Sequence, residues 1–272
     1  MDIVKGKVPH PRRMIVYGVA GIGKSTLVSS APKPFFLQAE DGNNDTGVDR
    51  LPVAETYDQL MDQVKWFSAN TGEYRTLALD TLDGVERLIQ REVCKDKGVQ
   101  NIEDIGYAKG HVFALDYWKP LKDALDWFRT ERSLTIALIA HASVARFDNP
   151  ETEPYDRYTP RIHKHAANLF AEWADEVLFT TYKLYTVETS QGFNKKRTRA
   201  VGQGERVIKT TERPSHVAKN RLGMPDELPL PKENGWSVIQ PWIDGTAKMP
   251  AQVPAPAPAS VKAETKKEVA HV

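Results

Sequence analysis

A glycine-rich stretch followed by a lysine and a serine, GVAGIGKS at residues 18–25, carries the strongest chemical signal in the sequence. It matches the pattern G-x-x-x-x-G-K-[ST] in full and follows a short apolar run. Glycines permit the backbone angles that turn successive amides toward a phosphate, a lysine can reach the terminal phosphates, and a serine hydroxyl can bind Mg²⁺. The stretch therefore predicts a loop that binds ATP with Mg²⁺. The residues expected to contact them are Gly18, Gly21, Ile22, Gly23, Lys24, Ser25 and Thr26.

Two acidic residues at the ends of predicted strands are expected to complete this site. Asp80 ends the apolar run TLALD, and with Ser25 it is the predicted metal ligand. Glu40 follows FFLQA and is predicted to polarise the attacking water, with Asp41 and Asp83 as alternatives. Ligands of parallel sheets gather where the strands end, so Asp80 and Glu40 are expected to converge on the loop.

A histidine also follows a predicted strand. His141 ends LTIALIA, a position from which a polar side chain can sense the γ-phosphate. A single histidine at such a place is equally compatible with a structural role. Both interpretations stay open at this point.

The elements that must position these residues alternate between strand and helix patterns. Apolar runs predict strands at 14–17, 35–39, 76–80 and 135–140. Apolar residues at helical spacing predict helices at about 56–67, 85–93, 115–128 and 162–173. Further on, VLFTTYKLYTVET and RVIKTT predict two long strands joined by the loop QGFNKKRTRAVGQGE. The sequence thus predicts an α/β fold with a mainly parallel central sheet, helices on both faces and an antiparallel hairpin extension.

The composition of the chain indicates its domain division and excludes some classes of protein. Residues 1–248 are predicted to form one domain, and the Pro/Ala-rich segment 249–272 a disordered tail. The 37 basic and 36 acidic residues nearly cancel, so any case for nucleic-acid binding must rest on local clusters. Cys94 is the only cysteine, and no stretch has 18 uninterrupted apolar residues. We expect a cytoplasmic protein without a membrane span.

Together, GVAGIGKS, the glutamate of LQAEDG, LALDT and the later segment AKNRLG resemble the RecA/RadA/KaiC-like P-loop ATPases. The resemblance is strongest to the small phage proteins of that group that act as recombinases or single-strand annealing proteins, and it covers residues 14 to about 243. It implies a RecA-like fold, a homo-oligomer with ATP between subunits, and Lys219 and Arg221 reaching the neighbouring subunit's γ-phosphate. It also implies a phage protein in the infected bacterial cytoplasm.

Some features of that superfamily have no counterpart in this sequence. There is no lid domain of AAA+ type, no zinc finger as in full-length RadA and no evident N-terminal polymerisation helix of RecA type. The form of assembly, ring or filament, therefore stays open.

Two basic stretches suit single-stranded DNA. Residues 192–221 contain nine Lys/Arg and two acids, and ASVARFDNPETEPYDRYTPRIHKH after His141 is predicted to be a long loop with cations and interleaved aromatics. In RecA-like relatives the corresponding loop binds single-stranded DNA. The expected DNA contacts are Arg146, Arg157, Arg161, Lys164, Lys195, Lys196, Arg197 and Arg199.

The sequence thus predicts a Mg²⁺-dependent ATPase that binds single-stranded DNA and supports recombination or annealing. Its catalytic set would be Lys24, Asp80 and Glu40 of one subunit with Lys219 and Arg221 of the next. A single-strand-binding protein is considered as a partner of the tail. Two alternatives stay open: a nucleotide or small-metabolite kinase, which would need an acceptor pocket and a lid, and an ATP-dependent regulatory switch that does not bind DNA.

Overall fold

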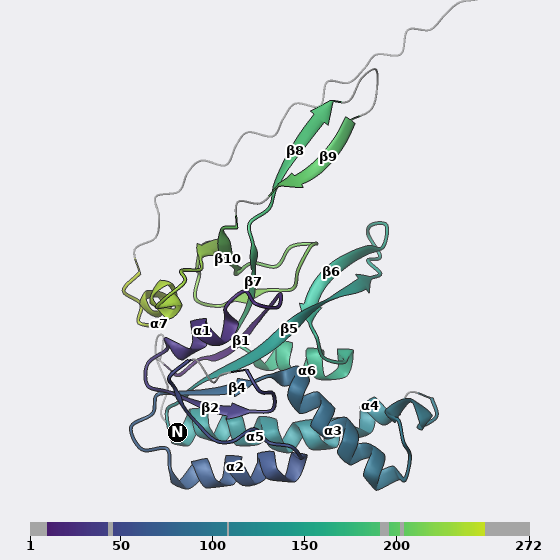
Figure 1. Cartoon of the computed structure of the whole chain (residues 1–272), viewed down its shortest axis with the longest axis vertical. Helices are drawn as coiled ribbons and strands as arrows, with labels where there is room; N and C mark the ends of the chain where they lie inside the picture. The colour runs from purple at the N-terminus through teal and green to yellow at the C-terminus, as the bar shows by residue number, and fades with distance from the viewer. Residues whose placement is uncertain (1–9, 43–45, 108, 191–195, 202–203, 248–272) are drawn as a thin grey trace, which may run out of the picture.

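The four apolar runs predicted to form strands lie in one sheet of the computed structural model, which describes residues 10–42, 46–107, 109–190, 196–201 and 204–247. The strands are β1 (Arg13–Gly18), β2 (Pro34–Gln38), β3 (Asp49–Arg50), β4 (Thr76–Asp80), β5 (Thr135–Phe147), β6 (Tyr155–Pro160), β7 (Glu176–Tyr182), β8 (Tyr185–Ser190), β9 (Lys196–Val201), β10 (Arg206–Lys209), β11 (Lys219–Asn220) and β12 (Glu227–Pro229). The main sheet has the order β12-β10-β7-β1-β5-β4-β2-β3, with β11 beside β7 and β6 beside β5 (Figure 1).

The centre of this sheet is parallel, as predicted. The strands β7, β1, β5, β4, β2 and β3 pair in parallel, whereas β6, β10, β11 and β12 are antiparallel additions. All parallel strands therefore end at the same edge of the sheet. The residues that follow β1, β2, β4 and β5 are brought together there.

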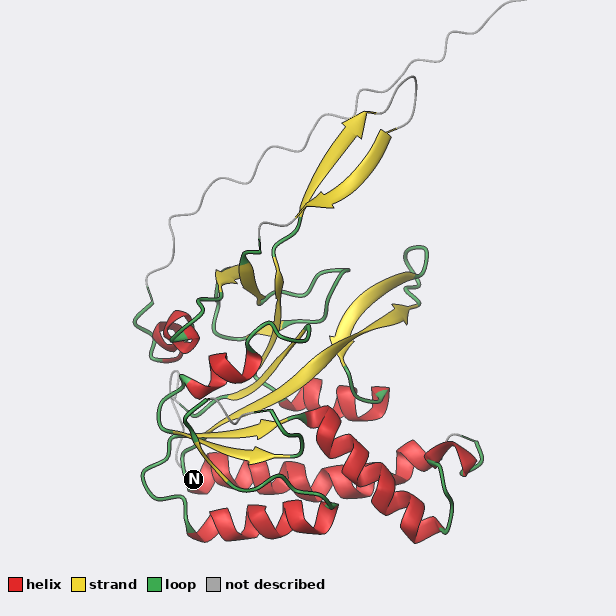
Figure 2. Ribbon diagram, viewed as in Figure 1, coloured by secondary structure: helices red, strands yellow, loops and turns green. Residues whose placement is uncertain are grey.

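Helices cover both faces of the sheet, which also agrees with the prediction (Figure 2). They are α1 (Lys24–Ser29), α2 (Tyr57–Ala69), α3 (Leu82–Lys97), α4 (Gly110–Phe113), α5 (Leu115–Glu131), α6 (Lys164–Trp173) and α7 (Gln240–Ile243), with 3₁₀ turns η1 (Ile102–Asp104) and η2 (Gly235–Val238). The longer helices α2, α3 and α5 lie on one face, and α1 and α7 lie on the other (Figure 2). The predicted helices correspond to α2, α3, α5 and α6.

Alternate residues of β1 belong to two separate cores. Ile15 and Tyr17 pack with α2, α3, α5 and α6, while Met14 and Val16 pack with α1, η2 and β10. All four side chains are at most 2% exposed. Because both faces are buried, the strand is apolar without alternation from Met14 to Tyr17, which is why the sequence pattern predicts it well.

The antiparallel extension is present, but the prediction of two long strands joined by a loop was wrong in detail. The first predicted strand is two strands, β7 and β8, and the predicted loop contains β9. β7 pairs with β10 in the main sheet, whereas β8 and β9 form a separate two-stranded ribbon that projects from the sheet (Figure 1). The segment of β9, KRTRAV, is polar and basic, so it lacks the apolar signal that predicts a strand.

The segment after His141 is not a long loop, and that prediction was wrong. β5 continues to Phe147 and pairs with β6 from Ala142↔Pro160 to Phe147↔Tyr155. This second ribbon also projects beyond the sheet (Figure 1). Its residues are largely exposed or half-buried, so polarity hid the strand pattern here as well.

The predicted tail at 249–272 lies outside the described residues, as does Lys195. Within the described ranges, none of the helices combines the length and the apolar character that crossing a membrane requires.

Candidate functional site

The loop between β1 and α1 has the conformation that the glycine pattern predicts. Gly21 and Gly23 have φ angles of 71° and 101°, in the left-handed region where a side chain would be strained. Gly23 is the N-cap residue of α1, and Lys24 is the first helical residue. The first amides of α1 therefore adjoin the loop, which is the arrangement that binds phosphate.

Two residues predicted to contact the nucleotide have another role in the loop. A Cβ atom at Gly18 would lie 2.1 Å from the hydroxyl oxygen of Thr180, so this glycine permits close packing against β7. The side chain of Ile22 is fully buried in the core beneath the loop. Only its backbone can contribute to a binding site.

Lys24 lies back over the loop. Its Nζ donates to the carbonyl oxygens of Gly18 and Val19 at 3.2 and 3.1 Å, and the residue is 6% exposed. Burial lowers the pKa of Lys24, and the negative charges of Asp80 and Asp83 oppose that shift. The ammonium group therefore lies against the loop, and phosphate oxygens of a bound nucleotide could replace the two carbonyl oxygens as its hydrogen-bond acceptors.

Ser25 and Asp80 meet, as a magnesium site requires. The Ser25 hydroxyl donates a hydrogen bond of 2.6 Å to Oδ2 of Asp80, which ends β4 and is 5% exposed. Both groups supply hard oxygen donors of the kind that Mg²⁺ prefers. The donor set therefore fits a Mg²⁺ ion bound through Ser25, with Asp80 holding the ion or one of its waters.

Glu40 converges on the same place. Gln38 of β2 lies in register with Asp80 of β4, so the residue two positions beyond Gln38 reaches the site from the neighbouring strand. Oε2 of Glu40 accepts a 2.8 Å hydrogen bond from the Thr81 hydroxyl, which also accepts from the amide of Gly84 and so caps α3. The predicted convergence of the two acids is confirmed.

These groups border one cavity of about 550 Å³. Its lining includes Lys24, Ser25, Thr26, Glu40, Asp80 and His141. Asp41, the alternative base, also lines this cavity. Three strand ends and the glycine loop therefore enclose a space with a lysine on one side and carboxylates on the other.

Asp83 lies beside the cavity and, unlike Glu40, is buried and held by several hydrogen bonds. It is 4% exposed and accepts hydrogen bonds from the His141 amide (3.0 Å), His141 Nδ1 (2.9 Å) and Arg161 (2.7 Å). Burial alone would raise the pKa of Asp83, but these hydrogen bonds outweigh it and lower the pKa to about 2. A carboxylate that is ionised and so fully engaged is a poor base, and this favours Glu40 over Asp83.

Oxygen and nitrogen atoms of Glu40, Asp83 and His141 lie within 4.8 Å of one another. Arg161 contacts Asp83, and Arg87 lies 3.6 Å from Glu40 and 3.8 Å from Asp83. The two guanidinium groups already supply positive charge to this cluster, so we assign no second metal there.

A family model described as an AAA domain matches residues 10–222, more than three quarters of the chain. The chain belongs to this AAA-domain family. No curated protein matches the chain. The match spans the glycine loop, Glu40, Asp80 and both projecting ribbons. Together with the mainly parallel sheet, it identifies a P-loop NTPase fold of the ATPase type, which uses a nucleotide and typically Mg²⁺.

Two predicted site residues of this AAA domain lie far from the cavity. β11 pairs with the start of β7, at the sheet edge opposite the P-loop. Nζ of Lys219 donates to the carbonyls of Ala171 and Glu172 at the end of α6, and Arg221 pairs with Asp175 at 3.0 Å. Neither residue belongs to the nucleotide cavity of its own subunit.

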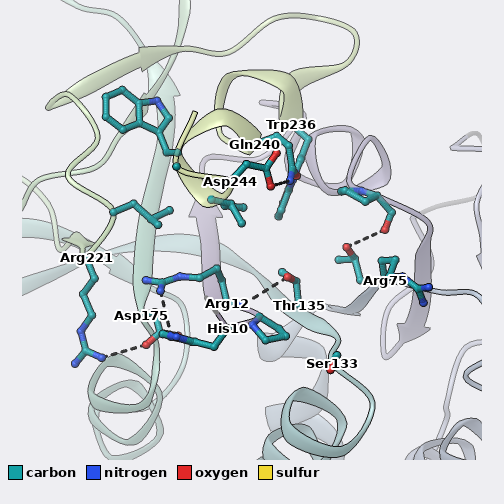
Figure 3. A pocket seen from close by; sticks show the side chains of 17 residues that line it. His10, Arg12, Arg75, Ser133, Thr135, Asp175, Arg221, Trp236, Gln240 and Asp244 are labelled. Atoms are coloured by element: carbon teal, nitrogen blue, oxygen red, sulfur yellow. Dashed lines mark hydrogen bonds and ion pairs between the residues drawn. The ribbon is translucent and has the colours of Figure 1, made fainter. Parts of the chain in front are cut away.

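A larger cavity, of about 1090 Å³, lies at that opposite edge (Figure 3). Arg221, Asp175 and Arg12 line one side of it, and Trp236, Gln240 and Asp244 line another (Figure 3). It contains no part of the glycine loop. The larger of the two cavities is therefore not the predicted nucleotide site, which lies at the other edge of the sheet.

The predicted DNA contacts divide among several places. Arg146 and Arg157 lie on the β5–β6 ribbon, Arg161 follows β6 and binds Asp83, and Lys164 is the exposed first residue of α6. Lys196, Arg197 and Arg199 belong to β9. Arg161 therefore forms its ion pair at the base of the β5–β6 ribbon, next to the nucleotide cavity, and not on the exposed surface of the ribbon.

Arg206 is a residue of this site that sequence reasoning missed. It is the first residue of β10, and its Nη1 donates to the carbonyl of Ile22 in the P-loop at 2.9 Å. In the sequence it was only one of nine basic residues, 184 positions from its partner. No local pattern could have distinguished it.

Proposed function

We propose that this AAA domain is a Mg²⁺-dependent ATPase of the RecA-like type that acts on single-stranded DNA in recombination or single-strand annealing. The observation that carries the proposal is the position of Glu40. Most strand-rich P-loop ATPases place a glutamate directly after the acid that ends the β4-type strand, but here Thr81 follows Asp80. The candidate base comes instead from β2, the next strand of the sheet, where the resemblance to RecA-like proteins expects it.

In the proposed reaction, the residues that line the cavity first bind the nucleotide and then activate the attacking water. The P-loop amides and Lys24 bind the phosphates, with Lys24 exchanging its two carbonyl contacts for phosphate oxygens. Bound Mg²⁺ would neutralise charge on the β- and γ-phosphates. Glu40, oriented by Thr81, accepts a proton as the water oxygen attacks the γ-phosphorus and the bond to the β-phosphate oxygen breaks. The products are ADP and inorganic phosphate.

The two projecting ribbons support DNA as the partner. On β5–β6, Arg157 lies 3.8 Å from the ring centroid of Phe147, and Tyr158 is 37% exposed. Between β7 and β8, Leu184 is 66% exposed, and Tyr182 and Tyr185 are also exposed. Cations with exposed aromatics suit a single strand, whose backbone is tracked by charge and whose bases stack on rings.

The position of Lys219 and Arg221 supports assembly. They lie at the edge of the sheet opposite the nucleotide cavity. In a head-to-tail homo-oligomer that edge faces the cavity of the next subunit, so the two cations would reach ATP in trans. A phage origin, a bacterial cytoplasmic location and a single-strand-binding partner belong to this proposal as well.

The proposal is tested by measuring the ATPase rate with and without a single-stranded oligonucleotide, with duplex DNA of the same length as the control. We expect a severalfold rise with the single strand. An unchanged rate with unimpaired ATP turnover would reject the DNA role and leave the regulatory switch. Stoichiometric phosphoryl transfer to a small acceptor would identify a kinase.

A further inference from the structure

Arg206 approaches the P-loop from the side of the sheet that does not carry Asp80. β10 lies two strands from β1 on one side, and β4 lies two strands from it on the other. Nη1 of Arg206 donates to the Ile22 carbonyl at 2.9 Å and would lie 2.8 Å from a Cβ atom at Gly23. The guanidinium group is therefore in contact with the peptide between Ile22 and Gly23.

Among the described residues, no carboxylate forms an ion pair with Arg206, and its Nη2 atom is buried without a hydrogen-bond partner. Two acids line a small cavity together with Arg206, but both have other partners: Glu205 accepts from the Tyr185 hydroxyl, and Glu227 is paired with Lys183 and Lys209. An arginine held against a phosphate-binding loop without a counter-ion is expected to be neutralised when an anion binds there.

We propose that Arg206 is a positioning residue for the nucleotide: it fixes the Ile22–Gly23 peptide of the P-loop and supplies positive charge to the bound polyphosphate from the side opposite Asp80. The inference rests on ATP binding at the P-loop. The carbonyl of Ile22 and the amide of Gly23 belong to one peptide unit. A charge-assisted hydrogen bond to the carbonyl polarises that unit and strengthens its N–H as a donor to phosphate.

Arg206 is proposed to act in nucleotide binding and not in hydrolysis. Glu40, Asp80 and Thr81 approach the cavity from the other side of the P-loop, and Arg206 does not line that cavity. Its loss should therefore weaken the binding of both ATP and ADP and raise KM. The turnover number at saturating ATP should stay close to that of the wild type.

The test is titration calorimetry with MgATP and MgADP on wild type, Arg206→Ala, Arg206→Lys and Arg206→Gln. Lys24→Ala and Arg91→Ala, an exposed arginine of α3, serve as controls. We expect Arg206→Ala to lose about 10- to 100-fold in affinity, as a hydrogen bond from a charged group would. Arg206→Lys, which keeps the charge, should recover part of that loss, and Arg91→Ala should match the wild type.

Thermal unfolding without nucleotide and steady-state kinetics complete the test. Equal affinities of a folded Arg206→Ala variant and the wild type would overturn the inference, as would a lower turnover number with an unchanged KM. If Arg206→Ala does not fold, Arg206→Gln decides in the same way, because it keeps a donor and loses the charge. A wild type that binds no MgATP would instead contradict the proposed function.

Discussion

The hydroxyl of Ser25 and the carboxylate of Asp80 share a hydrogen bond of 2.6 Å, although 55 residues separate them in the chain. Ser25 is the second residue of α1, the helix after the P-loop, and Asp80 ends β4. This contact joins the phosphate-binding loop to the acidic side of the cavity. It is also the pair between which a magnesium ion is expected to be coordinated.

The first prediction concerns this pair. Asp80→Asn removes the negative charge that would hold Mg²⁺ or its water, while keeping the size of the side chain. The affinity for ATP in the presence of Mg²⁺ should fall by about 10- to 100-fold, as for the loss of a group that supports a metal ligand. Without Mg²⁺ the variant and the wild type should bind ATP alike. Calorimetry with and without EDTA measures both values, and an undiminished effect of Mg²⁺ in the variant would contradict the assignment.

The second prediction concerns the base. Glu40→Gln should bind MgATP normally and hydrolyse it about 10²- to 10⁴-fold more slowly, because the carboxamide cannot accept the proton of the attacking water. Asp41→Asn is the matched control, since its carboxyl group lines the same cavity. Release of phosphate under saturating ATP is the readout. A slow Asp41→Asn variant with a normal Glu40→Gln variant would transfer the role to Asp41.

Thr81 gives a third prediction, because its hydroxyl both donates to Glu40 and caps α3. Thr81→Val should lower the turnover number with little change in ATP affinity, and should cost about 1 kcal/mol in stability through the lost cap. Thr81→Ser keeps the hydroxyl and should restore both properties. If turnover in Thr81→Val remained at the wild-type value after its stability loss was verified, Thr81 would have no role in orienting Glu40.

The fourth prediction is a pH dependence. The pKa of Asp83 is lowered from 3.8 to about 2, so the ionised carboxylate favours the folded state by about 2 kcal/mol above pH 4. This stabilisation is lost as the pH falls from about 4 toward 2, because the unfolded chain then binds the proton first. Asp83→Asn should be destabilised by about that amount at pH 7, and its difference from the wild type should shrink below pH 4.

Urea unfolding across this pH range measures the Asp83 effect. Asp123→Asn, a control with a largely exposed side chain, should stay within about 0.5 kcal/mol of the wild type. A difference between Asp83→Asn and the wild type that did not vary with pH would show that the lost stability comes from packing and not from the charge.

The fifth prediction tests the proposed assembly. Protomers with Lys219→Ala and Arg221→Ala keep an intact P-loop, and Lys24→Ala protomers keep both cations. Mixing the two inactive variants should restore part of the ATPase rate, because wild-type sites can form across the boundary. Both variants must first show native thermal unfolding, since Lys219 and Arg221 also contact α6 and Asp175. Absence of rescue at every mixing ratio would argue against completion in trans.

The parts of this structure that the sequence predicts well are those where burial or a backbone requirement leaves a pattern. The strands around Ile15 and Leu79 have apolar centres without alternation, because both faces of the sheet are covered. The P-loop follows from glycines, two of which have left-handed φ angles. The convergence of Glu40 and Asp80 follows from the rule that parallel strands end at one edge.

The parts that the sequence does not predict depend on long-range pairing. The ribbons β5–β6 and β8–β9 have largely polar sequences, and the residues of β5–β6 beyond His141 are mostly exposed or half-buried, so these strands resemble loops in the sequence. The sequence favoured Glu40 but left Asp83 as an alternative base, and only the hydrogen bonds from His141 and Arg161 to its oxygens argue against Asp83. Arg206 reaches the P-loop only because β10 joins the sheet beside β7.

The central claim is that the loop at residues 18–25 binds the polyphosphate of MgATP through its amides and Lys24. It is tested most directly by titrating MgATP into the Glu40→Gln protein, in which hydrolysis is slowed, and into Glu40→Gln combined with Lys24→Ala. We predict saturable binding with one ATP per chain for the first protein, and no measurable heat of binding for the second. No binding by the first protein, or equal affinity in both, would contradict the account.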